Sequence, residues 1–427
     1  MAKATWLEKL LFFRSCRRRP SGIFNARFAR REHRRHGIFC KPDGLPRRCE
    51  LISKNAFEQD VKVRFNPRYD SLDHWRGVAA LWVLMFHGFG SIRIANLSVH
   101  PLIEWLKWIS DRGSFGVQLF FVISGYCIAA NIYRCHQKRI GAWGFFSDRL
   151  LRIYPTYWVA CLIAILMNAA ASPFNHVPLR ANLPENWRAA LANVFLVEPY
   201  VGYNPFLLVS WSLVYELGFY LMVALGFSLW RRGAGFALLL AMGVVCGLAG
   251  MLGVPHGLFY VLTYWPEFMC GGLVFIALWT KHSNKSGFWL PLVVMCGLVI
   301  PKMFAFPTLV SGKEMAETVA FALILFFLYP FDKKISNWRP LHWLAWVGTL
   351  SYSLYLTHIV FMGKVIGVAS RWVAADSLLQ LPVQLVGWGS AIIGAWLVFK
   401  FCEQPLERWR HSLRHRSFAP AKKTESK

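Results

Sequence analysis

Ten apolar segments of near-spanning length follow one another between residues 76 and 402. A helix needs about 20 mostly apolar residues to cross a bilayer, because lipid offers no partners for unpaired backbone groups. The sequence therefore predicts an all-α integral membrane protein, a bundle of about ten transmembrane helices. The predicted spans are 76–95, 115–133, 154–172, 208–229, 235–254, 258–279, 288–306, 315–331, 343–362 and 383–402.

The composition excludes two other classes of protein. Only 16% of the residues are charged and 56% are hydrophobic, whereas a soluble domain carries about 25% charged residues. The formal net charge is +26, but a nucleic-acid-binding domain spreads its basic residues over a folded polar surface. The apolar segments leave little surface of that kind, so we expect no nucleic-acid partner and a chain in contact with membrane lipids.

The distribution of the basic residues predicts the orientation. Ten spans place both termini on the same side, and 39 of the 48 Lys and Arg residues then fall on that side. Cytoplasmic loops of membrane proteins carry an excess of Lys and Arg. The sequence therefore predicts a multi-pass protein with both termini cytoplasmic.

The segments outside the spans predict the domain organisation. Residues 1–68 form a basic, Arg-rich segment without apolar periodicity, which is typical of a disordered cytoplasmic tail. The membrane domain is predicted at 69–406, followed by a basic cytoplasmic tail at 407–427. The longest connection, 173–207, contains an amphipathic stretch at 187–196 and is predicted to be a structured outer loop. The 10 Cys residues have no zinc-type spacing, so no metal is expected.

Three ionisable side chains lie inside the apolar spans, where a charge is costly and by default suggests a function. His87 lies eleven residues beyond Arg76, or about 16 Å along a helix. Counted from the outer surface, Glu216 and Glu267 come out at a depth similar to that of His87. A histidine oriented by a carboxylate suits general-base chemistry. The alternative is that each group only packs, hydrogen-bonded between helices.

Two further arginines, Arg149 and Arg152, precede the third span on the predicted cytoplasmic side. Together with Arg76 they would form a cationic mouth below His87. Such a cluster suits a phosphate-bearing ligand, although basic residues at this position also serve as ordinary anchors at the cytoplasmic interface.

Six motifs occur in a recognisable order: LDHWRGVAALWVLMFH, FGVQLFFVISGYCIA, FFSDRLLRIYPTYW, WSLVYELGFYL, GTLSYSLYLTH and CEQPLERW. In this order they resemble the acyltransferase-3 family of integral-membrane acyltransferases, from about Tyr69 to Leu406. The chain departs from the family pattern at Gln118, where Asp is common, so no carboxylate role is assigned there.

The resemblance implies a membrane O-acyltransferase of the bacterial inner membrane. It would move an acyl group, expected to be acetyl, from cytoplasmic acyl-CoA to a hydroxyl of an extracytoplasmic carbohydrate or glycolipid. Acceptors of this kind include lipopolysaccharide, exopolysaccharide and lipid-linked glycans. The donor, acetyl-CoA, is a substrate, and no metal is implied.

The resemblance also carries roles to individual residues. His87, Arg76 and Glu216 match catalytic positions, and Arg76, Arg149 and Arg152 match positions that bind the coenzyme. The side chains expected to line the substrate path are Ser124, Trp211, Ser212, Tyr352 and His358. His87 would either deprotonate the acceptor hydroxyl or carry the acyl group as an acyl-imidazole, with Glu216 orienting it.

A different class of function is also compatible with buried His and Glu residues. A proton-coupled secondary transporter or a glycolipid flippase places such residues at mid-membrane for proton relay. The chain lacks a paired pattern of broken helices in two halves, which argues against this alternative. Binding of coenzyme A separates the two classes, because only the enzyme requires it.

Overall fold

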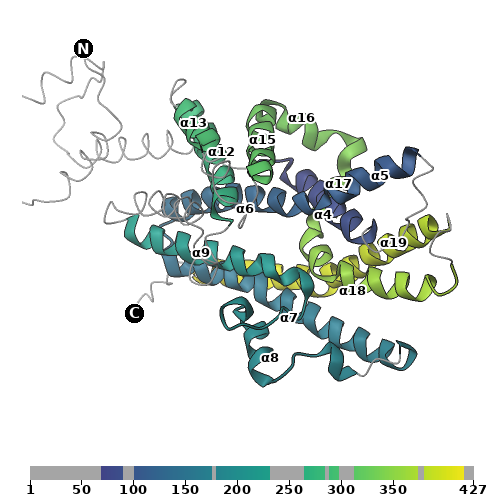
Figure 1. Cartoon of the computed structure of the whole chain (residues 1–427). Helices are drawn as coiled ribbons and strands as arrows, with labels where there is room; N and C mark the ends of the chain where they lie inside the picture. Colours follow the sequence, from purple (N-terminus) through teal and green to yellow (C-terminus); the bar gives the residue numbers. More distant parts are fainter. Residues whose placement is uncertain are drawn as a thin grey trace, which may run out of the picture. The chain divides into compact units, whose positions relative to one another are not determined.

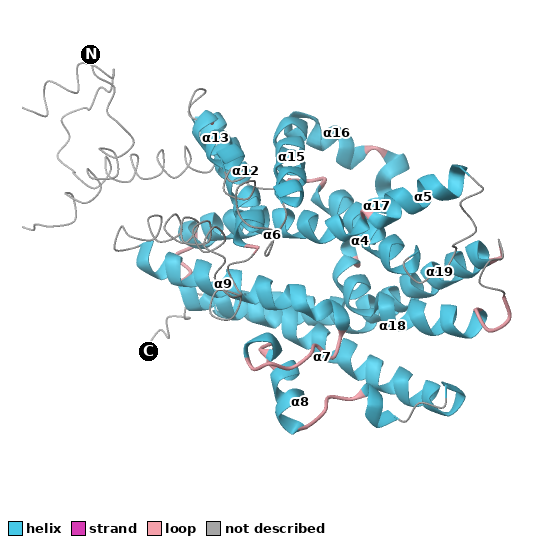
Figure 2. Ribbon diagram, in the orientation of Figure 1, coloured by secondary structure: helices cyan, strands magenta, loops and turns pink. Residues whose placement is uncertain are grey.

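The computed structural model describes residues 69–89, 101–175, 179–230, 264–283, 288–297, 312–373 and 379–417, and within these ranges every regular element is helical (Figures 1 and 2). The α-helices are α4 (Leu72–Phe89), α5 (Pro101–Asp111), α6 (Gly116–Gln137), α7 (Ala142–Asn175), α8 (Trp187–Val194), α9 (Trp211–Trp230), α12 (Trp265–Ser283), α13 (Trp289–Gly297), α15 (Gly312–Leu328), α16 (Asp332–Asn337), α17 (His342–Thr349), α18 (Ser351–Ala369), α19 (Gln380–Val398) and α20 (Gln404–Ser417). A π-helix, Phe399–Glu403, joins α19 to α20.

Six helical stretches of the described chain are long and apolar enough to cross a membrane. They are Glu104–Gln137, Ala142–Pro173, Leu208–Leu229, Glu314–Asn337, Ser351–Ala369 and Gln380–Arg410. The first predicted span corresponds to α4, whose first turns carry Asp73 and Arg76. The sixth and seventh are described only as α12 and α13, and the fifth span and the tail 1–68 lie outside the described residues. The all-helical membrane fold is thus confirmed, whereas the number ten and the orientation stay predictions.

The ninth span was predicted with the wrong start. Residues 343–362 were expected to form one helix, but the chain turns at Leu350, between α17 and α18. The two helices have different main partners: α17 packs on α4, whereas α18 packs mainly on α19 and also contacts α4. Apolar residues on both sides of Leu350 hide this turn from a hydropathy pattern.

Glycines bring α4 and α17 into close contact. A Cβ atom at Gly348 would collide with the carbonyl oxygen of Asp73, and one at Gly77 would collide with that of Leu344. At these two positions the backbones are so close that a glycine hydrogen fits but a methyl group does not. Small residues allow helices in a membrane to approach in this way. Because Gly77 is next to Arg76, this contact fixes the start of α4 and with it the position of that arginine.

We expect Gly348→Ala to lower the thermal midpoint of the detergent-solubilised protein by several degrees. The added methyl group must push α17 away from α4, and overpacking of this kind costs about 1–3 kcal/mol. Tryptophan fluorescence during heating measures the midpoint. Gly363→Ala in α18 is the control, since its Cβ would meet open space. An unchanged midpoint in Gly348→Ala would contradict the close α4–α17 contact.

The connection between α7 and α9 folds back along α7. Three aromatic side chains of α7 donate hydrogen bonds to consecutive carbonyl groups of this connection: Tyr157 to Asn193, Trp158 to Val194 and Tyr154 to Phe195. Tyr154 lies 21 residues before the end of α7 at Asn175, or about 31 Å along the helix. Figure 1 shows α8 beside the middle of α7. The predicted loop is therefore structured, and it folds back along α7 to the level of Tyr154.

Candidate functional site

Arg76 is held on the face of α4 that meets α6. Its Nη1 donates to Asp73 Oδ1 at 2.8 Å, and its Nη2 donates to Cys127 Sγ at 3.3 Å. Cys127 lies halfway along α6, so the arginine crosses from its own helix into the space between the two helices. About a fifth of the side chain, 22%, remains exposed. The guanidinium is thus oriented without being sealed from a ligand.

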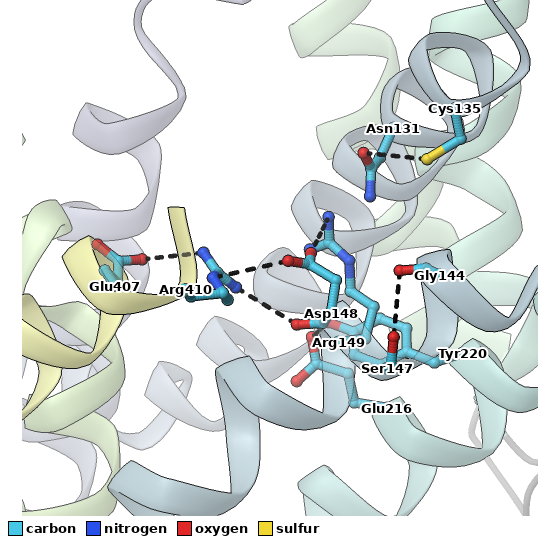
Figure 3. A network of polar contacts seen from close by, with 10 residues as sticks. All are labelled: Asn131, Cys135, Gly144, Ser147, Asp148, Arg149, Glu216, Tyr220, Glu407 and Arg410. Carbon is cyan, nitrogen blue, oxygen red and sulfur yellow. Dashed lines mark hydrogen bonds and ion pairs between the residues drawn. The ribbon is translucent and has the colours of Figure 1, made fainter. Parts of the chain in front are cut away.

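Arg149 is buried with part of its hydrogen-bonding capacity unused. Its Nη2 lies 3.9 Å from Asp148 Oδ2, and its Nε has no hydrogen-bond partner among the described residues. Asp148 is shared with Arg410, whose Nε lies 3.7 Å from Asp148 Oδ1 (Figure 3). The Arg149 guanidinium also lies 5.9 Å from the ring of Tyr220. A buried arginine with an unpaired donor is suited to bind an anion that enters its surroundings.

Arg152 lies one turn further along α7 and is half-buried. Its charge interacts with the carboxylates of Glu216 and Glu403. No ion pair to Arg152 lies within 4.0 Å among the described residues. The guanidinium is therefore attracted toward these two carboxylates, and its N–H groups remain available to a ligand. Cys127, which Arg76 contacts, also lies near Arg149 and Arg152, so the three arginines gather around its side chain.

Glu216 does not share a layer with His87, contrary to the prediction. Its Oε1 accepts a hydrogen bond from Ser124 Oγ at 2.7 Å and a short one from Tyr220 OH. Ser124 lies one turn from Cys127, the residue that Arg76 contacts, so Glu216 lies near the Arg76 end of α4. The count of depth assumed that the fourth span starts at the outer surface. Instead, the first turn of α9 lies beside Tyr355, near the start of α18. The pair predicted to orient His87 is not formed.

Glu267 belongs to the same layer as Glu216. It is completely buried near the start of α12, and the carbonyl of the following residue, Phe268, touches Gly125 of α6. Gly125 follows Ser124 directly, so both predicted acidic residues lie around this turn of α6. The two carboxylates thus share a layer with each other and not with the histidine.

His87 lies beside another histidine. Its ring centroid is 5.1 Å from that of His358 on α18, at an interplanar angle of 46°. His358 is 1% exposed, and its Nδ1 lies 3.0 Å and 2.8 Å from the carbonyl oxygens of Leu354 and Tyr355. The residue predicted to line the substrate path is therefore the direct neighbour of the predicted catalytic base.

The other predicted lining residues separate into two places. Ser212 Oγ is 2.7 Å from Tyr355 OH, and Trp211 packs edge-to-face on Tyr215. Tyr352, in contrast, donates to the carbonyl of Ile153 at 2.8 Å, directly after Arg152. Tyr352 thus belongs to the arginine cluster, whereas Ser212 lies on the His358 side through its contact with Tyr355.

Glu403 is a buried carboxylate that the sequence reading did not single out. The π-helix turns it inward, where it accepts a hydrogen bond from Ser353 Oγ and interacts with the charge of Arg152. Irregular helical turns of this type often occur at functional sites. An acidic residue at the end of the last apolar span, in the motif CEQPLERW, was the available signal.

Glu198 was also missed, although it is the one acidic residue of an apolar stretch, FLVEPYVGY. It is completely buried in the α7–α9 connection, and its Oε1 accepts a hydrogen bond from Ser210 Oγ at 3.4 Å. Its Oε2 has no hydrogen-bond partner among the described residues. Burial raises the pKa of the Glu198 carboxyl above its ordinary value. Its hydrogen bond with Ser210 joins this buried carboxyl to the residue that directly precedes α9.

We expect Glu198→Gln to flatten the pH dependence of stability. A carboxyl whose pKa is raised by folding contributes stability at low pH, and this contribution is lost as the pH rises through the raised pKa. The thermal midpoint of the wild type should therefore fall toward neutral pH more than that of Glu198→Gln. Glu185→Gln, an exposed position in the same connection, is the control. The same dependence of the thermal midpoint on pH in all three proteins would contradict the burial of an ionisable Glu198.

A cavity of about 780 Å³ lies between the last turns of α7, the connection and α18. Its α18 wall includes Leu356, Val360 and Lys364. His358 lies about 200° around the helix from Leu356 and from Val360. The cavity and the histidine pair therefore occupy opposite faces of α18, so we assign the cavity no part in the chemistry at His87.

Residues 69–400 match the model of an acyltransferase domain. The chain is 24% identical to the acyltransferase MdmB of Streptomyces mycarofaciens, in a match that covers 75% of this chain and 89% of that protein. It is 28% identical to the exopolysaccharide production protein ExoZ of Rhizobium meliloti, over 58% of this chain and 75% of the relative. No solved structure matches significantly.

Proposed function

The chain belongs to the acyltransferase-3 family of membrane acyltransferases, and from this premise we propose that it acylates a carbohydrate. The acyl group, which we take to be acetyl, comes from acyl-CoA on the cytoplasmic side of the bacterial inner membrane. The acceptor is a hydroxyl of an extracytoplasmic glycan or glycolipid. The relative ExoZ is an exopolysaccharide production protein by name, which supports an acceptor of this class.

The observation that carries the proposal is the placement of arginines and histidine along one set of helices. Arg76, Arg149 and Arg152 converge around Cys127, with donors left for an anion. His87 lies three helical turns beyond Arg76 on the same helix. A coenzyme bound through its phosphates at the arginines would extend its pantetheine arm along α4 and bring the thioester toward His87.

The transfer at His87 follows from this arrangement. One nitrogen of the neutral imidazole removes the proton of the acceptor hydroxyl, and the oxygen attacks the thioester carbonyl. The new C–O bond forms, the C–S bond breaks, and the coenzyme leaves as a thiolate that takes up the proton held by His87. In the two-step form, His87 itself attacks the carbonyl and passes the acyl group on. Both forms require His87 to have a free lone pair.

Transfer of a labelled acyl group tests the proposal. Purified protein in lipid nanodiscs is incubated with [¹⁴C]acetyl-CoA and with surface glycan extracted from a strain in which the gene has been deleted. We expect label in the glycan as a base-labile ester, and loss of the ester acetyl NMR signal from the deletion strain. No labelled ester together with an unchanged NMR signal would overturn the proposal. A transporter would give that result, and acetyl-CoA would not stabilise it.

A further inference from the structure

We propose that His358 is a positioning residue for His87, a role that rests on the proposed function. In this role, the Nε2 lone pair of His358 accepts a hydrogen bond from the His87 ring. That bond fixes the tautomer of His87, so that its other nitrogen carries the lone pair used in transfer. The family comparison does not supply this assignment, and the sequence reading placed His358 only along the substrate path.

The tautomer of His358 follows from its backbone contacts. Its Nδ1 lies 3.0 Å from the carbonyl oxygen of Leu354 and 2.8 Å from that of Tyr355. A carbonyl oxygen only accepts hydrogen bonds, so Nδ1 must carry the hydrogen. In a neutral imidazole the second nitrogen is then an acceptor. The Nε2 of His358 therefore presents a lone pair.

This lone pair is buried and unused. His358 is 1% exposed, and its Nε2 has no hydrogen-bond partner among the described residues. A buried polar atom without a partner costs about 1–3 kcal/mol, so its retention calls for an explanation. The His87 ring, with its centroid 5.1 Å from that of His358, is a polar group close enough to supply the missing partner.

The proposed bond forms by a rotation of the His87 ring, from the present interplanar angle of 46°, that directs its N–H to His358 Nε2. Hydrogen bonds between catalytic groups are often long in the free enzyme and tighten once the substrate is bound. The hydrogen bond on one ring nitrogen decides which form the other nitrogen takes. His358 thus performs for His87 the orienting role that Glu216 was predicted to perform.

Two amide substitutions test whether His358 acts as a hydrogen-bond acceptor or only fills space. His358→Gln places an amide oxygen near the position of Nε2, whereas His358→Asn keeps a polar atom near Nδ1 and loses the acceptor. We expect kcat for acyl transfer to fall on the order of 100-fold in His358→Asn, within the range that general-base catalysis contributes. His358→Gln should retain most of kcat, and KM for acetyl-CoA should not change in either variant.

The outcomes distinguish this proposal from the proposed function. Equal kcat in the Gln and Asn variants, with the wild type active, would overturn the positioning role alone. A rise in KM without a change in kcat would overturn it as well, because it would place His358 in ground-state binding. A wild-type protein that transfers no acyl group would overturn both proposals. Thermal midpoints of the three proteins, measured alongside, show whether a variant has lost its fold. If His358→Asn has lost it, the test rests on His358→Gln, and a folded Gln variant with kcat on the order of 100-fold below the wild type would overturn the role.

Discussion

His87→Gln is expected to lower acyl transfer by 10²–10⁴-fold, the range attributed to a positioned general base. The amide keeps the size and polarity of the side chain but cannot hold a proton in transit. It also cannot form an acyl-imidazole, so both versions of the mechanism lose their reactive nitrogen. KM for acetyl-CoA should stay near the wild-type value, because the coenzyme phosphates are proposed to bind at the arginines. Initial rates of [¹⁴C]acetyl transfer in nanodiscs measure the effect.

A second histidine on the same helix provides the matched control. His74 is also buried on α4, thirteen residues before His87, or about 20 Å away along the helix. His74→Gln should therefore keep transfer within a few-fold of the wild type. Equal losses in the two variants would show that any polar change on α4 disturbs the enzyme, and full activity in His87→Gln would rule out His87 as base or nucleophile.

The same pair of variants also distinguishes the two versions of the mechanism. Wild-type protein incubated with [¹⁴C]acetyl-CoA and no acceptor should retain label on the chain if His87 carries the acyl group. His74→Gln should then retain it as well, and His87→Gln should not. No label above background in the wild type, combined with normal transfer when the acceptor is added, would leave direct attack by the acceptor hydroxyl as the route.

The sequence grouped residues by the end of the span at which they stand. Arg76, Arg149 and Arg152 were predicted to form one cluster for this reason, and in the structure all three lie near Cys127. The pairing of His87 with Glu216 was wrong, because the count of depth assumed that the helix carrying Glu216 starts at the outer surface. The real neighbour, His358, comes from the span whose start was misplaced.

Two structural features could not be read from hydropathy at all. The turn at Leu350 depends on α17 meeting α4 through Gly348, a tertiary contact between segments far apart in the sequence. The return of the α7–α9 connection depends on carbonyl groups accepting from Tyr154, Tyr157 and Trp158. Aromatic residues near the ends of spans are usually interface anchors, and here they hold the connection against α7.

Arg152→Gln is expected to raise KM for acetyl-CoA by about 10–100-fold while kcat changes little. A hydrogen bond to a charged group contributes about 1.5–3 kcal/mol, and each 1.4 kcal/mol corresponds to about a tenfold change in affinity. Arg152 is the best test of the cluster because no ion pair within 4.0 Å holds it among the described residues. Removing Arg149 would also disturb Asp148, which that arginine shares with Arg410.

A coenzyme without its 3′-phosphate shows whether Arg152 contacts that phosphate directly or only attracts the coenzyme through its charge. If Arg152 binds that phosphate, 3′-dephospho-acetyl-CoA should have a raised KM with the wild type and nearly the same KM as acetyl-CoA with Arg152→Gln. Arg134→Gln removes an exposed charge from the neighbouring helix α6 and should leave the ratio of the two KM values at the wild-type level. If both KM values rise in Arg152→Gln and their ratio stays at the wild-type level, the guanidinium of Arg152 binds the diphosphate instead. If neither KM value rises, Arg152 is not part of the coenzyme site, and its attraction to Glu216 and Glu403 is structural.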